Sequence, residues 1–201
     1  MEKAKVVLLC CLAAALYGIA HHEITVRVCA EYFTIAHPPL FPTASRTLLA
    51  ACWGIAATVW AGAAFGVVLA SVSQSDGSPP VPISRLRNSV AGLLCAMAMT
   101  ALAAGMLGFH LSLRSMISVP AGIANVIPVT AHNRFMAVWL AHIASYVAGF
   151  AGGAILIYRL WRERGRPRAI PLFPRTKLGM MRAHSSRSHR VGVIYFRLGR
   201  S

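Results

Sequence analysis

The sequence predicts an all-α integral membrane protein, a four-transmembrane-helix bundle with both termini cytoplasmic. Two observations predict this fold class. Of the 201 residues, 57% are hydrophobic and 12% are charged, and the mean hydropathy is +0.61, a balance too apolar for an ordinary soluble domain. The apolar residues also gather in four runs, each about long enough to cross a hydrocarbon core of about 30 Å.

A four-span membrane domain is expected over residues 1–161. Its spans are predicted at about residues 5–21, 47–71, 88–111 and 134–161. The first run follows a basic start and ends in small residues, which is also typical of a cleavable signal peptide. A retained helix places the later charges on consistent sides of the membrane, and the sequence alone leaves both outcomes open.

Two outer loops are expected, at residues 22–46 and 112–133. Prolines exclude a regular helix from part of the first loop. Within it, Ile24, Val26 and Val28 alternate with polar residues, a pattern that predicts a short strand or an interfacial stretch.

The basic residues set the predicted orientation. Four of the twenty lie at the outer loops, namely Arg27, Arg46, Arg114 and Arg134, and sixteen lie in segments assigned to the cytoplasm, as the positive-inside rule requires. Twelve belong to the stretch from Arg159 onward. We expect residues 162–201 to form a disordered cytoplasmic tail or to lie along anionic lipid headgroups. Binding to a specific nucleic acid is not expected, because an apolar helix precedes this charge.

Small residues recur at every fourth position in three of the spans. The stripes are Gly54, Thr58, Gly62, Gly66 and Ala70; Gly92, Ala96, Thr100, Ala104 and Gly108; and Ala141, Ser145, Gly149 and Gly153. Residues at this spacing share one helix face and let a neighbouring backbone approach closely. The stripes predict a tight bundle with little room for a wide pore.

Histidines and carboxylates gather on the outer side of this topology. The candidate metal ligands are His21, His22, Glu23, Glu31, His37, His110 and His132. Imidazole and carboxylate are usual ligands of transition-metal ions, so this set predicts a metal site. Ion pairs with the outer arginines and a proton relay are the alternatives, because no spacing matches a motif such as HExxH.

His142 is a separate candidate, because it lies well inside the fourth span. A polar ring within a membrane span is costly unless it finds a partner, so it marks a potential cofactor site. Tyr146 lies one helical turn further on and is expected to share a hydrogen bond with it. Haem held by His142 and a second histidine is one possible occupant, less favoured than a metal ion. A quinone or lipid headgroup is another.

The segment after the first span also carries a resemblance. The run TVRVCAEYFTIAHPPLFPT, preceded by YGIAHHEI, resembles a set of bacterial multi-span proteins with an H-x-x-(I/V)-T-x-R-x-x-x-E-Y-F-T-like segment. The matching positions are His22, Ile24 in a shifted place, Thr25, Arg27, Glu31, Tyr32, Phe33 and Thr34. This resemblance implies the architecture and a bacterial inner-membrane location, and it transfers no catalytic residue.

Three functions follow from these patterns, and whether the chain is an enzyme stays open. The leading hypothesis is an inner-membrane protein whose outer His/Glu cluster binds a metal ion or takes part in redox or proton handling. The second is an accessory or assembly subunit that docks a larger membrane complex, or a second copy of itself, through the small-residue stripes. The third is a small-solute transporter.

Overall fold

The computed structural model describes residues 2–74 and 79–164, all within the unit Met1–Arg166. The predictions for the basic tail beyond residue 164 lie outside the described residues. The described part is entirely helical, with no strand. It therefore confirms the all-α fold class, and it corrects the strand considered at Ile24 to Val28, because helix α1 runs from Glu2 to Val28 without a break.

Four helices are long and apolar enough to cross a membrane. They are α1 (Glu2–Val28), α3 (Arg46–Ser73), α4 (Ile83–Leu113) and α6 (His132–Arg164). Each extends beyond the predicted span at both ends. Three short elements complete the fold, namely α2 (Glu31–Thr34), α5 (Ala121–Ala124) and the 3-10 turn η1 (Val129–Ala131).

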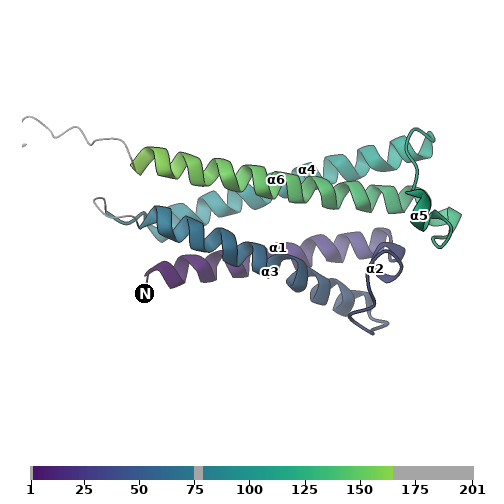
Figure 1. Cartoon of the computed structure of the whole chain (residues 1–201), viewed down its shortest axis with the longest axis horizontal. Helices are drawn as coiled ribbons and strands as arrows, with labels where there is room; N and C mark the ends of the chain where they lie inside the picture. Colours follow the sequence, from purple (N-terminus) through teal and green to yellow (C-terminus); the bar gives the residue numbers. More distant parts are fainter. Residues whose placement is uncertain (1, 75–78, 165–201) are drawn as a thin grey trace, which may run out of the picture. The chain divides into compact units, whose positions relative to one another are not determined.

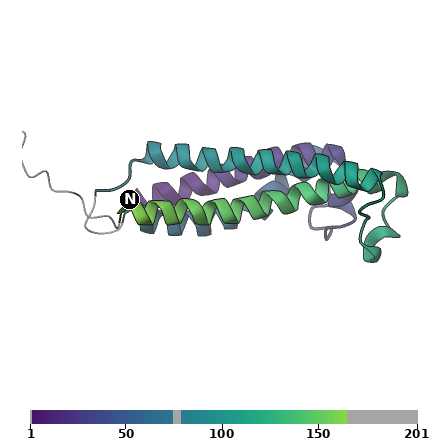
Figure 2. The ribbon, with the colours of Figure 1, turned by 90° about the horizontal axis from the view of Figure 1, so that it is seen from above.

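The long helices pair into two antiparallel hairpins, α1 with α3 and α4 with α6, as Figure 1 shows. Both hairpins turn at the same end, which carries α2 and α5 and is called the loop end below (Figure 2). Ser45 caps α3 there by accepting a hydrogen bond from Leu48 N at 3.3 Å. An ion pair between Arg85 and Glu163 joins α4 to α6 near the opposite end.

Glycines bring α1 and α3 into backbone contact. A Cβ atom added to Gly54 would lie 2.6 Å from Ile19 N and 2.7 Å from Gly18 C. At this contact the Thr58 hydroxyl donates to Ala14 O at 2.9 Å, across the helix pair. Close approach of small residues with cross-helix hydrogen bonds is the usual packing of membrane helices, so the predicted stripe on α3 is confirmed.

The second stripe, on α4, packs against another helix over only half of its length. A Cβ atom added to Gly92, its first member, would meet no neighbouring atom within 4 Å, whereas one added to Gly108 would lie 2.8 Å from Met136 O on α6. Ala96 and Thr100 are exposed. The prediction that this whole stripe packs within the bundle is therefore wrong for its first half, because α4 turns that face away from the other helices.

The two hairpins correspond position by position. Six residues of the first hairpin have an identical or similar residue 87 positions later, in the second hairpin. The pairs are Gly18 and Gly105, Thr25 and Ser112, Arg27 and Arg114, Thr58 and Ser145, Gly62 and Gly149, and Gly66 and Gly153. The packing follows the same offset. A Cβ at Gly62 would meet Cys10 of α1, and a Cβ at Gly149 would meet Met97 of α4, the residue that corresponds to Cys10.

We expect Gly54→Ala to destabilise the protein and Gly92→Ala not to. The added methyl group at residue 54 meets backbone atoms, and overpacking of this kind costs about 1–3 kcal/mol. At residue 92 it meets nothing, and the higher helix propensity of alanine contributes roughly 0.5–1 kcal/mol. Thermal unfolding of both variants in one detergent measures the difference. Equal melting temperatures would contradict the glycine contact.

Candidate functional site

Three histidines meet inside the bundle near the loop end. His21 and His22 come from α1 and His142 comes from α6. The His142 ring centroid lies 4.5 Å from that of His21 and 5.1 Å from that of His22. His22 and His142 are only 3% and 2% exposed. These residues form the histidine cluster, which sequence reasoning had divided between the outer loop and the fourth span.

Backbone hydrogen bonds orient two of these rings. His22 Nδ1 lies 2.7 Å from Gly18 O, and His142 Nδ1 lies 2.8 Å from Val138 O. A carbonyl oxygen can only accept, so Nδ1 carries the proton and donates in both rings. In the neutral imidazole the lone pair is then on Nε2, which can accept a proton, a hydrogen bond or a metal ion.

Two of the Nε2 atoms are left without a partner. Within the part of the chain that the structure describes, His21 Nε2 and His142 Nε2 are buried and make no hydrogen bond. A buried polar group left unsatisfied costs roughly 1–3 kcal/mol. Two such atoms on neighbouring rings indicate a site where a ligand supplies the missing hydrogen-bond or coordination partner.

Aromatic side chains surround the cluster on the side of α2. The Tyr32 ring centroid lies 4.6 Å from that of His142, and the Phe33 ring centroid lies 5.3 Å from that of His22. His37 continues this group, because its ring packs against Tyr32 and against Trp53 of α3, each at 4.8 Å. The short helix α2 thus covers the cluster with rings. Burial raises the pKa of the Tyr32 phenol, so it stays a neutral hydrogen-bonding group.

A hydrogen bond between two side chains joins the two hairpins next to the cluster, on the side away from the loop end. Tyr17 stacks on His21 with ring centroids 5.8 Å apart, and its hydroxyl lies 2.7 Å from Ser145 Oγ on α6. Sequence reasoning missed Tyr17, Tyr32 and Ser145 as members of the site. Tyr17 and Ser145 lie one helical turn from His21 and His142, and only this spacing could have pointed to them.

An apolar cavity of about 430 Å³ adjoins the cluster between α1, α4 and α6. Its wall contains Tyr17 and His21, and most of the remaining surface is aliphatic; examples are Leu102, Met106, Val138 and Ala141. Ligand-binding pockets have volumes of roughly 300–1,000 Å³ and few polar groups. The cavity is therefore suited to an apolar molecule that presents one polar end to His21.

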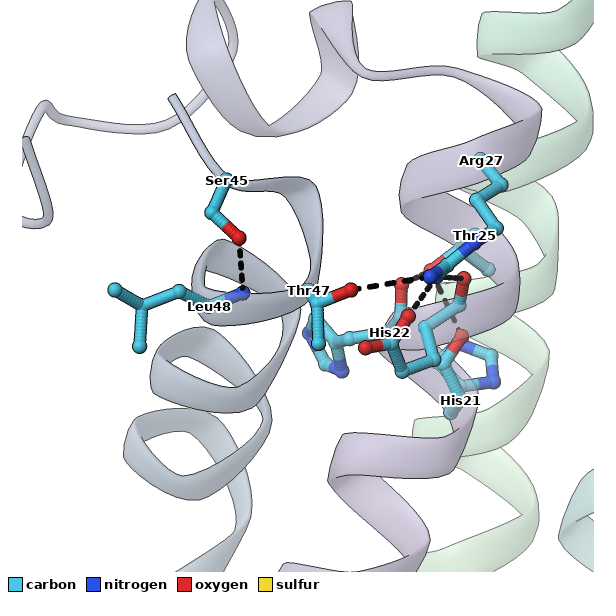
Figure 3. Close-up of polar contacts among 8 residues, drawn as sticks. His21, His22, Thr25, Arg27, Ser45, Thr47 and Leu48 are labelled. Carbon is cyan, nitrogen blue, oxygen red and sulfur yellow. Dashed lines mark hydrogen bonds and ion pairs between the residues drawn. The ribbon is translucent and has the colours of Figure 1, made fainter. Parts of the chain in front are cut away.

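The predicted carboxylate ligands are engaged elsewhere. Arg27 forms an ion pair with Glu23 and donates to Thr47 Oγ1 at 3.1 Å, which ties α1 to α3 (Figure 3). The Cys29 thiol donates to Glu31 Oε2 at 3.3 Å. Burial, and then this hydrogen bond, raise the pKa of Cys29 to about 11. Glu23 and Glu31 thus act in side-chain networks rather than with the histidine cluster.

Other predicted site residues lie apart from the cluster. His110 is exposed at the end of α4 and belongs to the cavity wall, while His132 Nε2 bonds Ile127 O at 3.0 Å. Tyr146 touches His142 with ring centroids 6.2 Å apart, and no hydrogen bond is formed between them. Among the described residues, no group of three His, Cys, Asp or Glu side chains is placed to hold a metal ion.

Haem does not fit between His21 and His142 as these two rings stand. Two axial imidazoles have the haem iron between them, but the rings of His21 and His142 are in direct contact.

No family model matches the chain, and no curated protein or solved structure matches it either. The chemistry of the site is therefore inferred from its geometry.

The Tyr17–Ser145 bridge should couple the two hairpins. We expect Tyr17→Phe and Ser145→Ala each to lower stability by about 0.5–1.5 kcal/mol, the usual net value of one hydrogen bond. The double variant should lose less than the sum, because both changes remove the same bond. Tyr158→Phe, at an exposed position, is the matched control. Strictly additive losses in thermal unfolding would contradict the bridge.

Proposed function

We propose that the protein spans a bacterial inner membrane four times, with both termini cytoplasmic and the loop end outside. The length and apolar composition of the four helices support insertion, and the excess of basic residues on one side supports this orientation. In this placement the histidine cluster lies close to the outer edge of the hydrocarbon layer. It is open to membrane-soluble molecules through the adjoining cavity.

A fluorescent protein that matures only in the cytoplasm tests this topology when it is fused after Ser201. We expect it to fluoresce, because the C-terminus follows the basic segment. Alkaline phosphatase, which is active only outside the cytoplasm, should be active when it is fused after Ser118, between α4 and α5. The reverse pattern would place the loop end inside.

We further propose that the cluster binds a quinol-like molecule through a hydrogen bond from one of its ring hydroxyls. The observation that carries this proposal is the pair of buried, unpartnered Nε2 atoms of His21 and His142 beside an apolar cavity. A quinol combines an apolar tail, which suits the cavity, with ring hydroxyls that can donate to Nε2. A neutral histidine accepts such a hydrogen bond at the ring nitrogen that carries no proton.

The ligand would meet groups that the structure already orients. Its ring hydroxyl donates a hydrogen bond to Nε2 of His21, the histidine of the cluster that belongs to the cavity wall. The Nδ1–H bond of His142 to Val138 O holds the His142 ring against His21, with ring centroids 4.5 Å apart. The positions corresponding to His22 and His142 in the other hairpin are Phe109 and Ile55, so the site occurs once, at the seam between the hairpins, where repeat-built membrane proteins commonly bind ligands.

A transition-metal ion is the second candidate ligand. Histidines that bind metals through one ring nitrogen usually donate the other N–H to a carbonyl or carboxylate, as His22 and His142 do here.

An accessory-subunit role is a further alternative. The half of the α4 stripe at Gly92, Ala96 and Thr100 is exposed, and small residues are the usual contact face between membrane helices.

We expect decylubiquinol to bind the purified full chain and His21→Leu to weaken that binding about tenfold, which corresponds to one lost hydrogen bond to a buried partner. Tryptophan fluorescence in mild detergent, without a histidine tag, measures the affinity. His132→Leu is the control, because His132 bonds a carbonyl and lies outside the cluster.

Elemental analysis of the same samples separates the two ligands. Equal quinol affinity in wild type, His21→Leu and His132→Leu would overturn the quinol proposal. A stoichiometric transition metal that His21→Leu removes would assign the cluster to metal binding instead.

A further inference from the structure

A second cavity lies at the loop end and, unlike the first, is polar. Three arginines from three helices line it. Arg27 lies in the last turn of α1, Arg46 begins α3, and Arg134 lies in the first turn of α6. With Glu31 and the apolar residues Val26, Val28 and Ala30, they enclose about 240 Å³. This group is called the arginine pocket below. All three arginines are exposed, so a ligand can reach them from outside.

Two of the three arginines are available to a ligand. Arg27 is held by Glu23 and Thr47. Arg46 and Arg134 form no ion pair or hydrogen bond with any described residue, although both are near enough to Glu31 to help lower its pKa. The larger cause of that lowered pKa is a hydrogen bond to the carboxylate from its own backbone N–H, and partial burial opposes it. Glu31 is therefore ionised at neutral pH.

The pocket thus presents two free guanidinium groups beside one carboxylate. A guanidinium is a planar fork of donors that matches two oxygens of a phosphate. A carboxylate is an acceptor with about four lone-pair sites, of which the Cys29 thiol uses one and the Glu31 backbone N–H another. The charge pattern is complementary to a ligand with a phosphate and a nearby ammonium group. A purely anionic ligand would leave Glu31 facing like charge, which is unfavourable.

We propose that the arginine pocket binds the phosphoethanolamine headgroup of a membrane lipid, with Arg46 and Arg134 on the phosphate and Glu31 on the ammonium. The pocket lies where the spanning helices end, at the depth of lipid headgroups. Its apolar wall of Val26, Val28 and Ala30 faces the start of the acyl chains. This proposal rests on the proposed membrane placement and is independent of the histidine cluster.

Native mass spectrometry of the full chain in mild detergent tests the proposal with three dioctanoyl lipids that share the same tails. We expect phosphatidylethanolamine to be retained in preference to phosphatidylglycerol and phosphatidylcholine. Phosphatidylcholine has a quaternary ammonium and cannot donate a hydrogen bond to Glu31. Arg46→Gln combined with Arg134→Gln should weaken phosphatidylethanolamine binding at least tenfold. Arg114→Gln, which changes an exposed arginine at the end of α4 outside the pocket, should leave it unchanged.

Glu31→Gln separates headgroup recognition from simple charge attraction. It should abolish the preference for phosphatidylethanolamine over phosphatidylglycerol, because the ammonium loses its partner and the glycerol lipid loses a repulsion. Thermal unfolding confirms that each variant is folded, and Arg46→Lys, which keeps the charge without the fork, should weaken binding only in part. Equal retention of the three lipids by wild type, or the same loss in Arg114→Gln, would overturn the proposal. Glycerophosphoethanolamine binding as tightly as the lipid would overturn the lipid assignment.

Discussion

The backbone contact between Gly18 and Gly54 sets the packing of α1 on α3 and the orientation of one buried histidine. A side chain larger than hydrogen at either position would push α1 away from α3. His22 donates its Nδ1–H to Gly18 O, at this same contact. The residue that sets the helix packing therefore also supplies the acceptor that fixes the orientation of a buried histidine.

The site depends on a difference between two corresponding hairpins. Each hairpin packs through small residues at matched positions, so the pair can form a regular bundle without polar side chains at the seam. The first hairpin nevertheless contributes His21 and His22, where the second has Gly108 and Phe109, and the second contributes His142, where the first has Ile55. Packing does not require these polar rings, and burying them is unfavourable. Their presence on both sides of one seam therefore supports a role in function.

The sequence was sufficient for the four helices and for most of their packing, because apolar runs and four-residue spacing are local properties. It was not sufficient for the histidine cluster. The first span was expected to end near residue 21, which placed His22 and His37 in an outer loop and His142 alone in the membrane. Helix α1 continues to Val28, and about 10 Å of extra helix places His22 level with His142. Contacts such as Tyr17 to Ser145 join residues far apart in sequence, and no local pattern predicts them.

Metal binding and ion-pair scaffolding were both plausible uses of the carboxylates, and the geometry bears on each residue in turn. Glu23 neutralises Arg27, and Glu31 lies between Arg46 and Arg134, so each carboxylate has a cationic neighbour within its own network. The histidines have no such neighbour. They are enclosed by aromatic rings and by one another, an environment that disfavours a charged imidazolium. A neutral imidazole with a free lone pair is the form that accepts a hydrogen bond from a bound hydroxyl.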